Sequence, residues 1–142
     1  MPRDTETGLY HEECFNEFLA LEEKRCERSD SAVFLMLADF SAFVDMYERQ
    51  KIAKSMMDAI SDVTRDTDVK GWHIDGLVMG IMFTEITGRE ATAHVVDKCL
   101  GSLSSHLGMD RLSRIQISWQ ENGNGQWERP LSYSVGSLLE TG

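Results

Sequence analysis

The feature that most constrains this fold is an Asp75-Gly76 step between two apolar runs, at residues 69–74 and 77–83. Such a step is among the strongest short-range signals for a β-hairpin, because the tight turns that match strand twist need residues with positive φ. The run at residues 32–39 is continuously apolar and rich in β-forming residues, which predicts a central strand covered on both faces. A sheet that contains this strand and the hairpin is therefore expected.

Helical periodicity lies before and between these strands. The expected helices cover residues 10–28, 42–65 and 87–107. Apolar and polar side chains alternate over residues 115–120, and residues 127–135 are expected to return as an edge strand. After the first helix the order is β-α-β-β-α-β, which predicts an α+β, ferredoxin-like fold with a central sheet of about five strands flanked by helices.

The composition is that of one soluble globular domain, with 142 residues, 42% hydrophobic and 27% charged. A single domain over residues 1–142 is therefore expected. The net charge of −10 argues against nucleic-acid partners and against anionic membrane surfaces, since both are bound by clustered Lys and Arg. No apolar run approaches the ~20 residues that cross a bilayer, and three cysteines without paired spacing indicate reduced thiols, so a cytoplasmic location is expected.

Three segments resemble the GGDEF family, the diguanylate cyclases. The segment DTETGLY at residues 4–10 is similar to the family's opening D-x-L-T-G-L motif. DFSAF at residues 39–43 is similar to its D-x-D-x-F strand end, and HIDGL at residues 73–77 falls where the G-G-D-E-F hairpin should be. The resemblance covers about residues 4–118, and the C-terminal part diverges. It implies a GGDEF-type sheet flanked by helices.

The resemblance also implies that Asp39 and Asp75 correspond to the carboxylates that hold the metal ions, with Mg²⁺ as the ion. The signature glycines, however, are His73 and Ile74 here, and the signature Glu is Gly76. The family's guanine-reading and phosphate-holding segments have no counterpart. No catalytic residue is therefore assigned and no cofactor is expected, with Asp39 and Asp75 interpreted as a vestigial metal pair. Alternatively, Asp75 simply suits the turn and Asp39 is an inherited strand-end residue.

Arg65 and Asp68 match the R-x-x-D of the family's inhibitory site, where cyclic di-GMP binds. An arginine fork suits phosphate or guanine edges, and a carboxylate accepts from guanine N–H groups. Only four residues separate Asp68 from His73, whereas five separate this motif from the signature in the family. The alternative interpretation is an exposed arginine that stabilises the dipole of the preceding helix.

Two functions from different classes remain. The first is a non-catalytic signalling module with a degenerate GGDEF-like fold, of the bacterial type that the resemblance implies. It would act through a protein partner or as a cyclic di-GMP receptor, and a homodimer is compatible with it. The second is a divergent Mg-dependent diguanylate cyclase that uses Asp39 and Asp75. The substitutions at residues 73–76 favour the first function.

Overall fold

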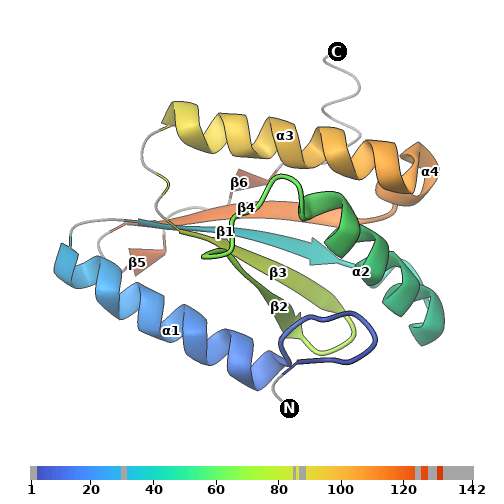
Figure 1. Ribbon diagram of the computed structural model, residues 1–142, viewed down its shortest axis with the longest axis horizontal. Coiled ribbons are helices and arrows are strands. Elements are labelled where there is room, and N and C mark those ends of the chain that lie inside the picture. The colour runs from blue at the N-terminus through green and yellow to red at the C-terminus, as the bar shows by residue number, and fades with distance from the viewer. Residues whose placement is uncertain are drawn as a thin grey trace.

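A computed structural model describes residues 3–29, 32–84, 86, 89–123, 126–127 and 131–132, with side chains described to residue 121 except at residue 89. The elements are α1 (Glu12–Ser29), β1 (Ala32–Asp39), α2 (Met46–Ile60), β2 (Val69–Ile74), β3 (Val78–Phe83), α3 (Arg89–Leu107), α4 (Met109–Leu112), β4 (Gln116–Gly123), β5 (Gln126–Trp127) and β6 (Leu131–Ser132). After α1 the predicted β-α-β-β-α-β order is confirmed, with α4 as a short addition (Figure 1). Within the described part, no helix is both long and apolar enough to cross a membrane.

The sheet consists of four long antiparallel strands in the order β2-β3-β1-β4. The two-residue strands β5 and β6 pair with β4. The prediction of about five strands is therefore wrong for the long strands, which number four. Of the edge strand predicted over residues 127–135, the described residues are 127 and 131–132, and the others lie outside the described part of the chain.

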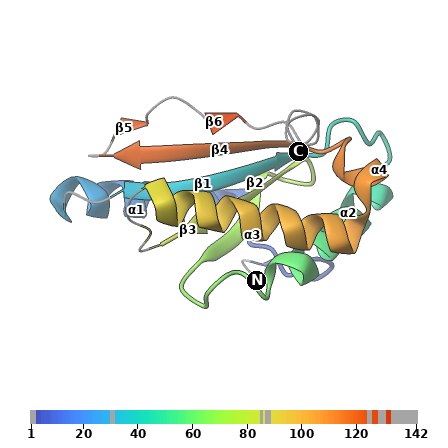
Figure 2. The same ribbon diagram turned by 90° about the horizontal axis from the view of Figure 1, so that it is seen from above.

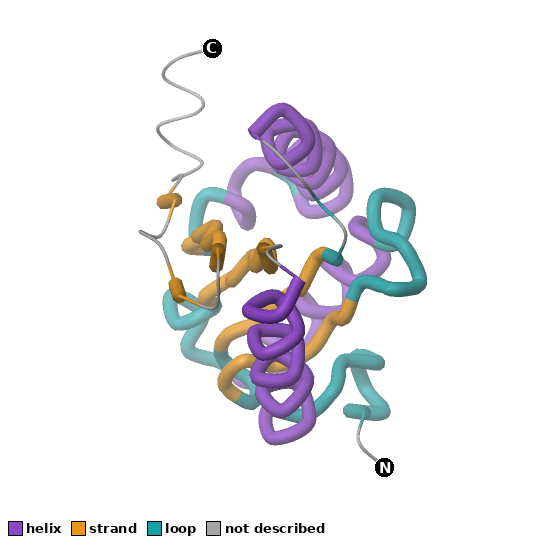
Figure 3. The backbone as a smooth tube through the Cα atoms, turned by 90° about the vertical axis from the view of Figure 1, so that its left-hand side faces the viewer, coloured by secondary structure: helices purple, strands orange, loops and turns teal. Residues whose placement is uncertain are grey.

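The sheet separates two apolar layers, because successive side chains of a strand point to opposite faces. On β1, Phe34 and Met36 join the larger core beneath α2 and α3. Val33 and Leu35 instead join a smaller core beneath α1. Figures 1 and 3 show α1 on one side of the sheet and α3 on the other. The prediction of a central strand buried on both faces is confirmed.

Helix α2 is shorter than the predicted 42–65. It begins at Met46 because Asp45 has an extended backbone (φ −79°, ψ 121°) and its side chain accepts the N–H of Tyr47 at 3.1 Å. It ends at Ile60, where the chain turns. Figure 2 shows α2 and α4 at the same end of the sheet.

Phe15 holds α1 directly against the β2–β3 hairpin. A Cβ added to Gly71 would lie 2.6 Å from the Phe15 ring, and one added to Gly80 would lie 2.7 Å from it. Both glycines therefore let the buried ring touch the backbone of the sheet. This contact places the start of α1 beside the hairpin turn.

Candidate functional site

The hairpin turn places Asp75 against the first turn of α1. Gly76 has φ +71°, a conformation that glycine adopts without strain. The Asp75 carboxylate accepts the backbone N–H of Glu12 at 2.8 Å, and the Glu12 carboxylate accepts the N–H of Asp75 at 2.9 Å. The Nδ1 atom of His11 lies 3.9 Å from the same Asp75 oxygen. Asp75 therefore caps α1 from across the fold.

Asp39 stands at the end of β1, where its carboxylate accepts the N–H of Ser41 at 2.8 Å. Each of the two carboxylates predicted to form a metal pair thus has a local structural partner. In the part of the chain that is described, no group of three or more His, Cys, Asp or Glu is placed to hold a metal ion. One oxygen of each carboxylate is engaged by a backbone N–H, and Asp75 lies at the start of α1. The vestigial metal assignment stays a prediction.

His73 lies at an irregularity in the β2–β3 pairing and is held by Asn16 of α1. The Asn16 amide donates to the His73 carbonyl at 3.1 Å, which directs its oxygen to the His73 Nδ1 at 2.9 Å. Nδ1 must then carry the proton, and Nε2 of the neutral ring is the acceptor. With Asp39, Gln116 and Ser118, His73 lines a cavity of about 290 Å³. This Asn16–His73 pair has no sequence signal, because 57 residues separate its members.

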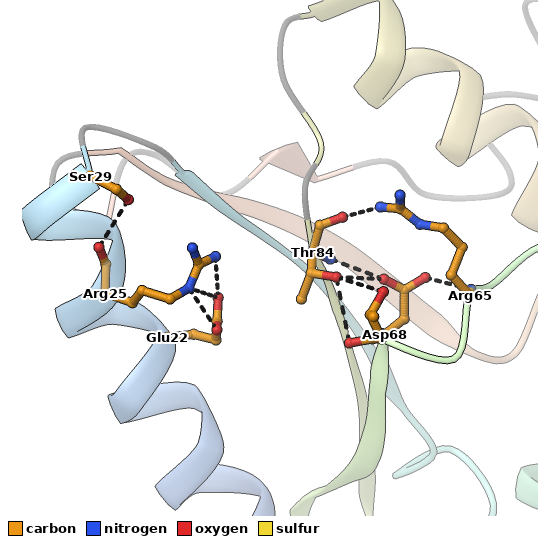
Figure 4. Close-up of polar contacts among 7 residues, drawn as sticks. Glu22, Arg25, Ser29, Arg65, Asp68 and Thr84 are labelled. Carbon is orange, nitrogen blue, oxygen red and sulfur yellow. Dashed lines mark hydrogen bonds and ion pairs between the residues drawn. The ribbon is translucent and has the colours of Figure 1, made fainter.

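Asp68 is buried and ties the α2–β2 turn to the chain after β3. Its carboxylate accepts the backbone N–H of Arg65 at 2.8 Å and that of Thr84 at 3.0 Å (Figure 4). The Thr84 hydroxyl also lies 3.3 Å from it. The Arg65 guanidinium donates to the Thr84 carbonyl. The structure therefore brings the two residues of the R-x-x-D motif together. The Asp68 carboxylate holds the backbone of Arg65 in place.

A cavity of about 370 Å³ opens beside this turn and is lined by Arg65, Asp68, Arg3, Lys70 and Tyr10, among others. The Arg3 guanidinium lies over the Tyr10 ring at 4.5 Å and donates to its hydroxyl at 2.8 Å. We call this the basic cavity, because three cationic side chains line it against two carboxylates, those of Asp66 and Asp68. Sequence reasoning missed Arg3 and Lys70. They meet there because the N–H of Tyr10 donates to the Lys70 carbonyl, which lays the N-terminal segment along β2.

The opening segment is organised by Asp4. Its carboxylate accepts from the Glu6 N–H at 3.0 Å, the Thr7 hydroxyl at 3.0 Å and the Trp72 indole N–H at 3.3 Å. Burial raises the pKa of Asp4, but these hydrogen bonds outweigh it, and the pKa lies below its ordinary value. The segment that resembles the family's opening motif thus serves as a loop fastened to β2.

Comparison with solved structures finds GGDEF domains. The GGDEF domain of DgcB from Caulobacter crescentus, in complex with c-di-GMP, gives a TM-score of 0.67 at 14% identity, over 98% of this chain and 84% of that chain. The fold is that of a GGDEF domain. The FimX GGDEF domain from Pseudomonas aeruginosa gives a TM-score of 0.66 at 11% identity, over 87% of this chain and 82% of that one. No family model and no curated protein matches the sequence.

Diguanylate cyclase SiaD from Pseudomonas aeruginosa, in complex with its activator SiaC, is also similar. The TM-score is 0.59 at 15% identity, over 97% of this chain and 54% of that chain. The predicted GGDEF-like fold is therefore confirmed. The hairpin predicted over residues 69–83 is present as β2 and β3, and Asp75 in its turn faces α1.

Proposed function

We propose that this chain is a non-catalytic regulatory module of the GGDEF fold that binds cyclic di-GMP at the basic cavity. The observation that carries the proposal is the gathering of Arg3, Arg65 and Lys70 around one cavity of about 370 Å³ in a protein of net charge −10. Cationic side chains concentrated in a concave site favour a ligand with anionic groups. The R-x-x-D string lies in its wall, as the resemblance to the inhibitory site requires.

The two arginines of the cavity suit different parts of such a ligand. Arg65 is exposed and its guanidinium donates to the Thr84 carbonyl, which orients the side chain at the cavity wall. A planar guanidinium matches the geometry of a phosphate. The Arg3 guanidinium covers the Tyr10 ring and offers a flat cationic surface. Nucleobases stack on such guanidinium planes. Asp68 supports the site by holding the Arg65 backbone in place.

The non-catalytic part of the proposal rests on the hairpin. Cyclisation of nucleotides needs positioned metal ions together with a clamped, oriented substrate. Here Asp75 caps α1, and the side chains of His73 and Ile74 stand where the family has glycines. These features support a module that binds a nucleotide signal without making it.

Titration calorimetry with cyclic di-GMP tests the binding site. Arg65→Ala is expected to weaken binding ten- to a hundredfold, since a hydrogen bond to a charged group contributes about 1.5–3 kcal/mol. Arg65→Lys keeps the charge, loses the fork and should fall between the two. Arg25→Ala is the matched control, because Arg25 forks onto Glu22 of α1 and does not line the cavity (Figure 4).

Two results would contradict the proposal. No heat at high ligand concentration, or binding that Arg65→Ala leaves unchanged, would remove the basic cavity as the site. Incubation with GTP and Mg²⁺ or Mn²⁺ tests the other part. Steady formation of cyclic product that Asp39→Ala abolishes would establish a cyclase instead of a receptor.

A further inference from the structure

Exposed apolar side chains gather at the end of the sheet where β1 and the hairpin turn meet α2. Six large hydrophobic side chains are strongly exposed among the described residues, and four of them belong to this region. These four, which we call the Val44 patch, are Val44 at 91% exposed, Tyr47 at 63%, Met46 at 60% and Ile74 at 44%. Exposed apolar groups scattered singly are ordinary, but a contiguous group of them marks an interaction surface.

Arg49 joins the two loops that carry the patch. Its Nε donates to the Gly76 carbonyl at 2.9 Å, and its Nη1 donates to the carbonyls of Phe43 and Val44 at 2.7 and 2.9 Å. The loop that holds Val44 is thereby fastened to the hairpin turn that follows Ile74. A shared arginine thus joins the two parts of the patch, although Arg49 and Gly76 are 27 residues apart in the chain.

The chain on both sides of Val44 is fixed as well. Phe43 is fully buried, and the Arg114 guanidinium lies 4.3 Å above its ring. Asp45 caps α2 through the N–H of Tyr47. Val44 thus lies between the buried Phe43 and the helix cap Asp45. Because its backbone is already fixed, its exposed side chain would lose little further conformational entropy on binding a partner. Such preorganisation is typical of residues that contribute strongly to an interface.

We propose that the Val44 patch is the docking surface for a partner protein that presents apolar side chains flanked by basic residues. This inference is separate from the basic cavity and goes beyond the proposed nucleotide binding. The exposed acids Asp45 and Asp75 adjoin Val44 and Ile74 in the chain. A basic partner would pair with them.

Charge also decides between a partner and a second copy. Each copy carries a net charge of −10, so two copies repel one another, whereas a basic partner is attracted from a distance. Charge beside the patch itself is mixed, because Arg49, Lys51 and Arg114 lie there as well as Asp45 and Asp75, so the net charge of the whole chain carries this step. Arg49 binds three carbonyls, and the Lys51 ammonium lies 4.7 Å above the Tyr47 ring.

The test uses defined probes. Three helical peptides of equal length are titrated by fluorescence anisotropy: one with a Leu face and Lys elsewhere, the same composition scrambled, and one with Glu in place of Lys. The Leu/Lys peptide is expected to bind at least tenfold more tightly than the other two, and more weakly as salt rises. Val44→Ser and Met46→Ser should each lower its affinity at least fivefold. Leu21→Ser is the control, because Leu21 is 63% exposed on α1, outside the patch.

Backbone NMR shifts should locate the bound peptide at residues 43–47 and 74–76. The proposal is overturned if the scrambled or Glu peptide binds equally well, or if Val44→Ser binds like the unmodified protein. It is also overturned if the protein dimerises in sedimentation equilibrium and Val44→Ser abolishes the dimer, since the surface would then serve a second copy. Both serine variants should unfold at the same urea concentration as the unmodified protein, because their side chains are already in water.

Discussion

The carboxylate of Asp75 accepts the backbone N–H of Glu12 at 2.8 Å, while the Glu12 carboxylate accepts the backbone N–H of Asp75 at 2.9 Å. This exchange resembles a capping box, in which each of two side chains accepts the backbone N–H of the other residue. Here, however, the two residues are 63 positions apart in the chain. The hairpin turn therefore supplies the cap of α1. A residue that resembles a metal ligand is used in this chain to join two elements.

Asp75→Ala is expected to lower the free energy of unfolding by about 1 kcal/mol, the usual effect of removing a helix cap. Asp75→Asn keeps an acceptor and should lose less. Urea denaturation followed by circular dichroism measures both. In a double-mutant cycle, Asp75→Ala and Glu12→Ala should couple by about 0.5 kcal/mol or more, as groups in one hydrogen-bonded network do. Strict additivity would mean that the exchange contributes nothing.

Gly80→Ala is expected to destabilise the fold by about 1–3 kcal/mol, because overpacking forces neighbours to shift. The added Cβ would lie 2.7 Å from the Phe15 ring. In a Phe15→Leu background the same substitution should be less damaging. Gly101→Ala is the matched control, since a Cβ there meets nothing within 4 Å and the residue lies within α3. It should raise stability by up to about 1 kcal/mol. Equal losses at both glycines would refute the packing argument.

The fold was predictable from the sequence because its signals are local. The Asp75-Gly76 turn, the apolar run of β1 and the helical periodicities each extend over a few residues, and together they gave the strand and helix order. The bounds of α2 were not predictable from periodicity. With Asp45 as its N-cap, the helix begins at Met46, four residues after the predicted start, and the apolar spacing continues past Ile60 into a turn.

For the candidate sites, the sequence predicted only short motifs and not the residues that come together in space. The proximity of Arg65 and Asp68 follows from their spacing, but Arg3 and Lys70 reach the basic cavity through pairing of the N-terminal segment with β2. The role of Asp75 depends in the same way on a partner far along the chain. Tertiary contacts of this kind leave no pattern in a single sequence.

The pKa of Asp4 predicts how the protein responds to acid. Burial raises this pKa, yet the hydrogen bonds from Glu6, Thr7 and Trp72 bring it below the ordinary value of 3.8. Folding therefore favours the ionised carboxylate. The resulting stabilisation is complete well above pH 4 and is lost as pH falls below it. In Asp4→Asn, urea midpoints should fall less steeply with acid than in the unmodified protein.

A charge-matched variant separates this effect from net charge. Glu6→Gln removes the same charge from an exposed neighbour and keeps the backbone N–H that Asp4 accepts. Urea midpoints for the three proteins are compared between pH 6 and pH 3. A Glu6→Gln variant that flattens the profile as much as Asp4→Asn would show that overall charge, and not the Asp4 hydrogen bonds, governs the acid response.

The Cys99 thiol is expected to be inert in the folded protein. Burial, and to a lesser extent the nearby Asp68 carboxylate, raises its pKa to about 12. At pH 8 only about one thiol in ten thousand would then be the reactive thiolate. Cys14 is the partly exposed cysteine of the three, whereas Cys26 is buried like Cys99. Iodoacetamide at pH 8, followed by peptide mass spectrometry, should therefore label Cys14 first. Cys99 should become labelled only when urea unfolds the chain. Labelling of Cys99 at the rate of Cys14 under native conditions would contradict its burial on the side of α3 that faces the core.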